Sequence, residues 1–159
     1  MPKSLIVRSR SEACVDAGKG FVSHTGPHGV INGDNRFAKF GTGSTKVIRI
    51  TRIICSADAN MRFRITQGPT TTADGAAQAV LNRRMGKGQP NEGVLYYGPT
   101  VTTEGSVVYD FWMLASDQVI LDFEDSPWIM DPGNSILVTV AAGGANNASF
   151  GMEWDEEAR

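Results

Sequence analysis

The stretch at residues 81–90, LNRRMGKGQP, places Arg83, Arg84 and Lys87 among two glycines and a proline. Glycine-rich loops that carry lysine can bind phosphate, but a P-loop requires G-x-x-x-x-G-K-[ST] between a strand and a helix. Here the earlier glycine and the Ser/Thr are missing, and Pro90 begins a new turn. We therefore exclude a nucleotide site. We expect the three cations to contact an acidic surface, on a sister subunit or on another protein.

Two histidines, His24 and His28, have the one spacing that could suit a metal ion. Their four-residue separation would align them on a helix, but the intervening Gly26 and Pro27 disfavour that helix. No cysteine or carboxylate nearby completes a ligand set. We expect no metal site and no cofactor.

Catalytic residues are also not expected. The chain has no G-x-S-x-G motif, and its only two histidines lie in a glycine-rich segment. The acidic runs DFEDSPW (122–128) and EWDEE (153–157) have the character of solvated strand ends rather than paired catalytic carboxylates. Cys14 and Cys55 lie in no CxxC pattern, and we expect buried thiols. The sequence therefore predicts a protein that is not an enzyme.

Charge is distributed unevenly along the chain. Residues 1–87 contain 14 Lys/Arg and 5 Asp/Glu, whereas residues 88–159 contain one Lys/Arg and 12 Asp/Glu. This asymmetry indicates either an electrostatic partner or strands from the two halves that pair within one fold. Binding to nucleic acid is not expected, because the isoelectric point is near 5.6 and the second half would repel phosphate.

Short apolar runs separated by turn residues must position these groups. In NMRFRITQ (60–67), Met61, Phe63 and Ile65 alternate with polar residues, which is the period of a half-buried strand. Turn chemistry such as DPGN (131–134) separates the runs. Only residues 72–85 could form a helical turn or two. Further strands are expected at residues 45–57, 93–98, 106–114, 118–124, 135–142 and 148–154.

Residues 1–44 have a different character from the remainder. They are rich in glycine and lack a sustained hydrophobic period, which predicts an extended N-terminal arm that orders against a partner. The apolar contacts expected from this arm are Phe21, Phe37 and Phe40. The sequence thus predicts an arm at 1–44 and one all-β sandwich domain at 45–159.

Two blocks of sequence carry a resemblance. The first contains the LNR element (Leu81, Asn82 and Arg83), and the second runs from PWIMDPGNSILVTV to FGMEWDEE. The matching residues of the second block are Pro132, Gly133, Ser135, Glu153, Trp154 and Glu156. In this order the elements, over roughly residues 45–157, resemble small virion proteins of tailed bacteriophages, which are head decoration or minor structural proteins with a jelly-roll-like sandwich. The loop after LNR is more basic and glycine-rich than in that group.

This resemblance implies a structural virion protein, most simply a capsid decoration (cement) protein. It would form a homotrimer, dock on the major capsid protein or another virion protein, and assemble in the host cytoplasm. No apolar run is long enough for a membrane helix, so no membrane partner is expected.

The alternative is a tail-tip or fibre module that binds a host glycan through an aromatic shelf, since jelly rolls often carry sugars. In that case Trp128, beside Pro127, is the aromatic expected to be exposed. Phe111 and Met113 alternate with Trp112, so one side of that strand is expected to face the core.

Overall fold

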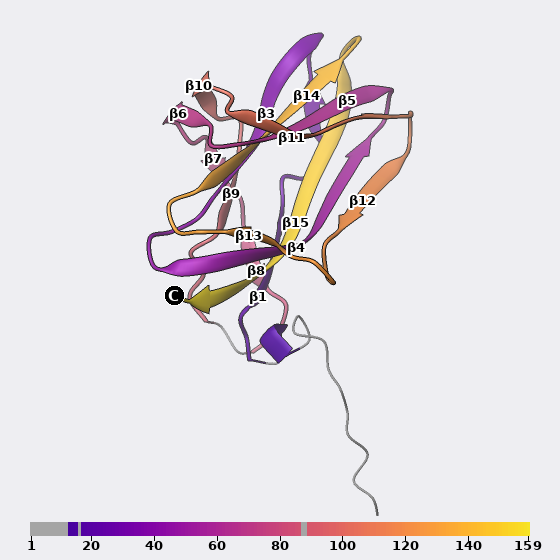
Figure 1. Cartoon of the computed structure of the whole chain (residues 1–159). Helices are drawn as coiled ribbons and strands as arrows, with labels where there is room; N and C mark the ends of the chain where they lie inside the picture. The colour runs from indigo at the N-terminus through magenta and orange to yellow at the C-terminus, as the bar shows by residue number, and fades with distance from the viewer. Residues whose placement is uncertain (1–12, 16, 87–88) are drawn as a thin grey trace, which may run out of the picture.

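The computed structural model describes residues 13–15, 17–86 and 89–159, which are almost entirely β (Figure 1). The strands in these residues are β1 (Gly20–His24), β2 (His28–Val30), β3 (Gly33–Gly41), β4 (Lys46–Ala57), β5 (Met61–Gln67), β6 (Thr70–Ala73), β7 (Ala76–Ala77), β8 (Val80–Asn82), β9 (Val94–Tyr97), β10 (Thr100–Thr103), β11 (Ser106–Met113), β12 (Gln118–Asp122), β13 (Trp128–Met130), β14 (Ser135–Ala142) and β15 (Asn146–Ala158).

Two large antiparallel sheets form the sandwich. The first has the order β12-β4-β15-β1-β8, with β13 added to β4 and β2 added to β15. The second has the order β11-β5-β14-β3-β9-β7, and β6 and β10 form a separate two-stranded ribbon. The predicted all-β sandwich is confirmed. The jelly-roll connectivity remains a prediction.

Alternation along the strands determines which side chains lie between the sheets. Along β5, Met61, Phe63 and Ile65 are fully buried, while Arg62 and Arg64 point outward. Along β4 the inward positions change from Ile48 and Ile50 to Ile53 and Cys55, because the pairing with β15 shifts by one residue between Glu153 and Trp154.

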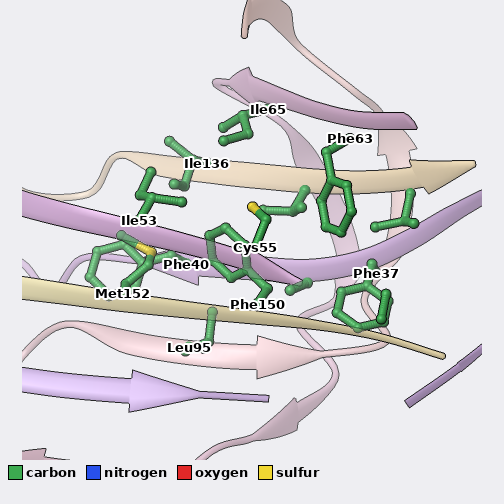
Figure 2. Close-up of a cluster of buried hydrophobic side chains, with 14 of the residues drawn as sticks. Phe37, Phe40, Ile53, Cys55, Phe63, Ile65, Leu95, Ile136, Phe150 and Met152 are labelled. Carbon is green, nitrogen blue, oxygen red and sulfur yellow. The ribbon is translucent and has the colours of Figure 1, made fainter. Parts of the chain in front are cut away.

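A single hydrophobic core fills the space between the sheets. Figure 2 shows aromatic and aliphatic side chains from both layers, including Phe40, Phe63 and Phe150, packed against one another. Cys55 is a buried thiol within this core, and burial raises the pKa of that thiol. Cys14 is also a buried thiol, as the sequence predicted. The large apolar fraction of the core makes sheet-on-sheet packing the dominant stabilising term.

The predicted N-terminal arm requires a correction. Residues 20–41 do not lie outside the domain, since β1 pairs with β15 and β3 pairs with β9 and β14. Glycines and polar residues separate the few apolar side chains of this segment, and these side chains face inward once the long-range strand partners are in place. Residues 1–12 lie outside the described residues.

The helical turns predicted for residues 72–85 are also wrong. This segment contains β7, which pairs with β9, and β8, which pairs with β1. Gly75 has a positive φ and lies against the backbone of Tyr97 and Gly98, so the chain bends sharply there. Across the part of the chain that the structure describes, no helix is long and apolar enough to cross a membrane.

Candidate interaction surfaces

The three phenylalanines predicted to dock on a partner lie in the core instead. Phe21 and Phe37 are each 2% exposed and Phe40 is fully buried. Phe21 stacks on Trp154, and Phe40 meets the same indole edge-on, with ring centres 6.0 and 5.0 Å away. Their prediction as partner-binding residues is therefore wrong, because they occupy inward positions of β1 and β3.

We call residues 82–92 the basic loop. Its first end is hydrogen-bonded to Gly18 and Gly20, in the N-terminal part of the described chain. The Asn82 side chain donates to the Gly18 carbonyl at 2.6 Å, and the Arg83 amide donates to the Gly20 carbonyl at 2.9 Å. The Arg84 amide in turn donates to the Asn82 side-chain oxygen. Lys87, which belongs to the basic loop, lies outside the described residues.

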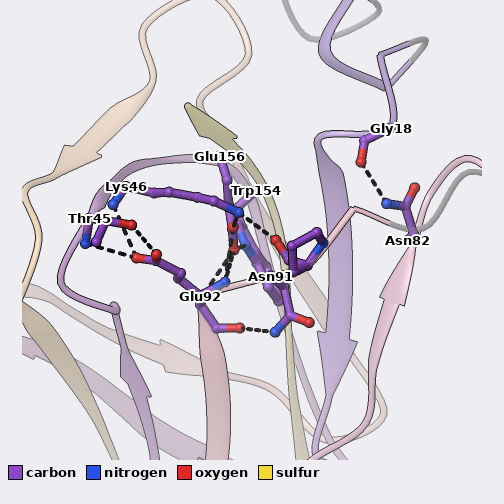
Figure 3. A network of polar contacts seen from close by, with 10 residues as sticks. Gly18, Thr45, Lys46, Asn82, Asn91, Glu92, Trp154 and Glu156 are labelled. Atoms are coloured by element: carbon purple, nitrogen blue, oxygen red, sulfur yellow. Dashed lines mark hydrogen bonds and ion pairs between the residues drawn. The ribbon is translucent and has the colours of Figure 1, made fainter. Parts of the chain in front are cut away.

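The second end of the basic loop is fastened to a buried carboxylate. Glu156 is 2% exposed and accepts hydrogen bonds from the Glu92 and Gly93 amides at 2.9 and 2.8 Å (Figure 3). It also accepts from the Trp154 indole and the Lys46 ammonium, each at 3.0 Å. Four donors from three segments therefore bind one buried carboxylate. Without these hydrogen bonds, burial of its charge would destabilise the fold.

Glu92 ties the same end of the loop to the start of β4. Its carboxylate accepts hydrogen bonds from the Thr45 hydroxyl, the Thr45 amide and the Lys46 amide. These bonds, with the Thr45 hydroxyl foremost, hold the pKa of Glu92 below its ordinary value. The loop thus leaves the sandwich from two fixed points, and Met85 in its middle is 96% exposed.

The cations of the loop are not uniformly available for a partner. An Arg83 Nη1 atom lies 3.5 Å from Glu153 of the same chain, so this cation already faces an acidic group. Arg84 forms no ion pair with any described residue, and its side chain is half-buried. The predicted contact of Arg83, Arg84 and Lys87 with an acidic partner stays a prediction.

The basic and acidic parts of the chain pair with each other across the strands. The long β4–β15 ladder brings Arg49 beside Glu157 and Arg52 beside Glu153. On the other sheet, Arg62 binds Asp110 of β11 through two hydrogen bonds. The asymmetry seen along the sequence is therefore largely compensated within one subunit.

Asp155 is the exception among the acidic groups of β15. It is 2% exposed, and its Oδ1 atom has no hydrogen-bond partner among the described residues. Burial raises the pKa of this carboxyl to about 6, partly opposed by Arg83 and Arg49 and reinforced by Glu157. Asp155 lies opposite Gly20 in the β1–β15 ladder, where a side chain on residue 20 would contact it.

Large apolar side chains are exposed along β11, which is an edge strand of the second sheet. Among the described strands β11 pairs only with β5, and the neighbouring edge strand β12 pairs only with β4. Trp112 is 70% exposed and Leu114 is 69% exposed. We call this region the apolar edge; it consists of the exposed apolar residues of β11 and of the position that follows it, Val107, Val108, Trp112 and Leu114.

The sequence contained part of this signal. The alternation of Phe111 and Met113 with Trp112 predicted that one side of the strand faces the core, and this is confirmed: Met113 is buried and Phe111 packs on Phe63. The exposure of Trp112 follows from the same alternation. Because β11 could equally have been a central strand, the sequence did not show that this side would lack a covering element.

The histidines do not form a metal site. His28 stacks on Tyr97 with ring centres 3.7 Å apart, while His24 points to solvent from β1. Within residues 13–15, 17–86 and 89–159, no three His, Cys, Asp or Glu side chains lie together as metal ligands would.

Comparison with known protein families finds no family model that matches the chain. Comparison with curated proteins likewise finds no match.

Proposed function

We propose that the chain is a structural component of a tailed-bacteriophage particle, a capsid decoration protein that works through contacts with copies of itself and with the shell. The observation that carries this proposal is the apolar edge. Strands at sheet edges are usually protected by charges, prolines or covering segments, because their unpaired backbone groups invite association. β11 presents Trp112 to solvent there, Leu114 is exposed directly after the strand, and the one acidic group of β11, Asp110, is bound by Arg62.

The resemblance in the LNR and DPGN–EWDEE blocks gives the proposal its virion context. An interface with few unpaired charges and a large aromatic side chain at its centre suits a permanent contact. We therefore assign the apolar edge to the contact between sister subunits. In a closed ring of three, this edge would meet a different surface of the next subunit.

The position in particles tests the function directly. Purified phage particles that contain this chain are analysed by quantitative mass spectrometry and by immunogold electron microscopy. Hundreds of copies spread over the head support a decoration protein. A handful of copies at the tail, or none in the particle, contradicts it.

The subunit contact is tested on the purified full chain by size exclusion with light scattering. A Trp112→Lys, Leu114→Lys double variant is expected to shift a trimer to a monomer, because two charges would have to be buried without partners. Leu81→Lys is the matched control, since Leu81 is 60% exposed on β8, an edge strand of the other sheet. A wild-type chain that is monomeric at all concentrations would contradict the assignment of the apolar edge to the contact between subunits.

A further inference from the structure

An open cavity of about 440 Å³ lies at the end of the sandwich where β13 meets the turns around β5, β11 and β14. Its volume falls in the range of sites for small ligands, roughly 300–1,000 Å³. We call it the end cavity. The residues that matter for its chemistry are Gln67, Ser106, Trp128, Met130, Asn134 and Ser135.

The end cavity continues the interior of the sandwich. Inward positions along β5 run through Met61, Phe63 and Ile65, and the next position in this series is Gln67. Gln67 pairs with Ser106 on one side and with Ile136 on the other. Gln67 is the exposed last residue of β5, so the apolar interior ends here and the opening of the cavity carries a polar side chain.

The lining carries polar groups but no charge. Its polar side chains are two amides, two hydroxyls and an indole, and no Asp, Glu, Lys, Arg or His contributes to it. The described hydrogen bonds include none to the side chains of Gln67, Asn134 or Trp128, and none to the hydroxyls of Ser106 or Ser135. These donors and acceptors thus remain available for a ligand.

The indole of Trp128 is held in place before any ligand arrives. Its ring packs against Tyr109 and Phe123, with ring centres 5.9 and 6.3 Å away, and its backbone pairs with Ile50 of β4. Trp128 is half-buried and lines the cavity. Little side-chain entropy would be lost when a ligand contacts it.

The rim of the end cavity is equally constrained. Gly68 and Gly105 both have a positive φ, and a Cβ on Gly105 would lie 2.1 Å from the Gln67 carbonyl oxygen. The two turns therefore pack backbone against backbone, which only glycine permits. The Gly68 amide also donates to the Ser135 carbonyl at 3.0 Å. The cavity is consequently formed by rigid turns.

We propose that the end cavity binds an uncharged sugar residue at the end of a glycan. A pyranose ring has an apolar face that packs on an indole and equatorial hydroxyls that both donate and accept hydrogen bonds. Amides and hydroxyls match this double role, whereas a phosphate or carboxylate would require cations that the lining lacks. This inference does not depend on the proposed decoration role, since sugar binding requires only the single chain.

The test uses the purified full chain and saturation-transfer NMR with the methyl glycosides of glucose, galactose, mannose and N-acetylglucosamine, with sialyllactose as the charged comparison. Binding of at least one neutral glycoside is expected, with the signal strongest for protons of its apolar face. No binding of any neutral glycoside overturns the proposal. Preference for the charged sialic acid residue overturns it too.

Variants then locate the site. Gln67→Ala and Asn134→Ala are expected to weaken the affinity about tenfold each, because each removes a hydrogen-bonding amide. Both side chains are exposed, so the fold should be unaffected. Gln118→Ala, an exposed glutamine of β12 outside the end cavity, is the matched control. Unchanged affinity in both Gln67→Ala and Asn134→Ala would place the sugar elsewhere and overturn the assignment.

Discussion

The described groups of the basic loop and those of the apolar edge are satisfied in different ways. The loop begins with hydrogen bonds from Asn82 and Arg83 and ends on the buried carboxylate of Glu156. At the apolar edge, Trp112 is exposed on β11, which has one described neighbour, and Leu114 is exposed directly after that strand. The region with the conspicuous charges is thus tied to its own chain, while the inconspicuous region has its apolar groups uncovered.

This difference shows why the order of charges along a sequence is a poor guide to a docking surface. Antiparallel pairing brings distant segments together, so Arg83 lies beside Glu153 and Arg52 lies between Glu153 and Asp122. An exposed apolar side chain at a sheet edge cannot be satisfied by an ion pair within the chain. Its burial requires another element or another molecule.

The largest expected effect comes from removing the anchor of the basic loop. Glu156→Ala would leave the Glu92 and Gly93 amides, the Trp154 indole and the Lys46 ammonium without their shared acceptor. We expect the free energy of unfolding to fall by about 3–5 kcal/mol, as when one partner of a buried ion pair is removed. Urea denaturation measures this.

The apolar edge supplies the contrast for that experiment. Trp112→Thr should change the free energy of unfolding of the monomer by less than about 0.5 kcal/mol, because the side chain is 70% exposed. Similar losses in Glu156→Ala and Trp112→Thr would contradict the distinction between an anchored loop and an uncovered edge.

A second, smaller effect is expected at Gly93, beside the same anchor. A Cβ there would lie 2.8 Å from atoms of Ile48, Phe40 and Trp154. Gly93→Ala is therefore expected to destabilise the fold by about 1–3 kcal/mol through overpacking. Thermal and urea unfolding report the loss. Gly29→Ala is the matched control, since a Cβ on Gly29 meets no atom within 4 Å, and equal losses in the two variants would show that the close packing at Gly93 is not the cause.

The smallest expected effect among the buried positions concerns Asp155, which neighbours Glu156 but lacks its donors. The folded-state pKa of Asp155, about 6, lies above its ordinary value of 3.8. Between these values the folded state binds a proton that the unfolded state does not, so stability rises as the pH falls through this window. Above pH 6 the native state contains a buried charge and is destabilised.

Asp155→Asn is therefore expected to raise the free energy of unfolding at pH 8 by about 1 kcal/mol and to flatten its pH dependence between pH 4 and 6. Urea denaturation at pH 8 and pH 5 measures both quantities. Asp122 does not titrate in this window, because a hydrogen bond from the Glu124 amide lowers its pKa. A less stable Asp155→Asn at pH 8 would show that the attraction of Arg83 and Arg49 outweighs burial.

Strands with strong local alternation could be predicted from the sequence. The series Met61, Phe63 and Ile65 identified β5, and DPGN identified the turn before β14, where Gly133 has the positive φ that such a turn requires. In these segments the local pattern and the tertiary environment agree, so propensity and burial favour the same structure.

Residues 20–41 could not be predicted in this way. Phe21 and Phe40 are separated by glycines and polar residues, and they become inward-facing only because β1 pairs with β15 and β3 pairs with β9. Such pairing depends on segments far away in the sequence. For the same reason, the sequence could not show that Arg83 lies beside Glu153. The apolar edge could be recognised only once β11 was known to be an edge strand.

The central place of β15 has a consequence for how the chain folds. β4 and β1 both pair with β15, so the first sheet lacks its central strand until residues 146–158 have been synthesised. At about 5–20 residues per second, synthesis leaves β4 waiting on the order of ten seconds for its main partner. Contacts so distant in sequence also slow folding itself. During that interval the isoleucine-rich β4 is exposed to aggregation, and a chaperone that shields it would raise the yield of folded protein.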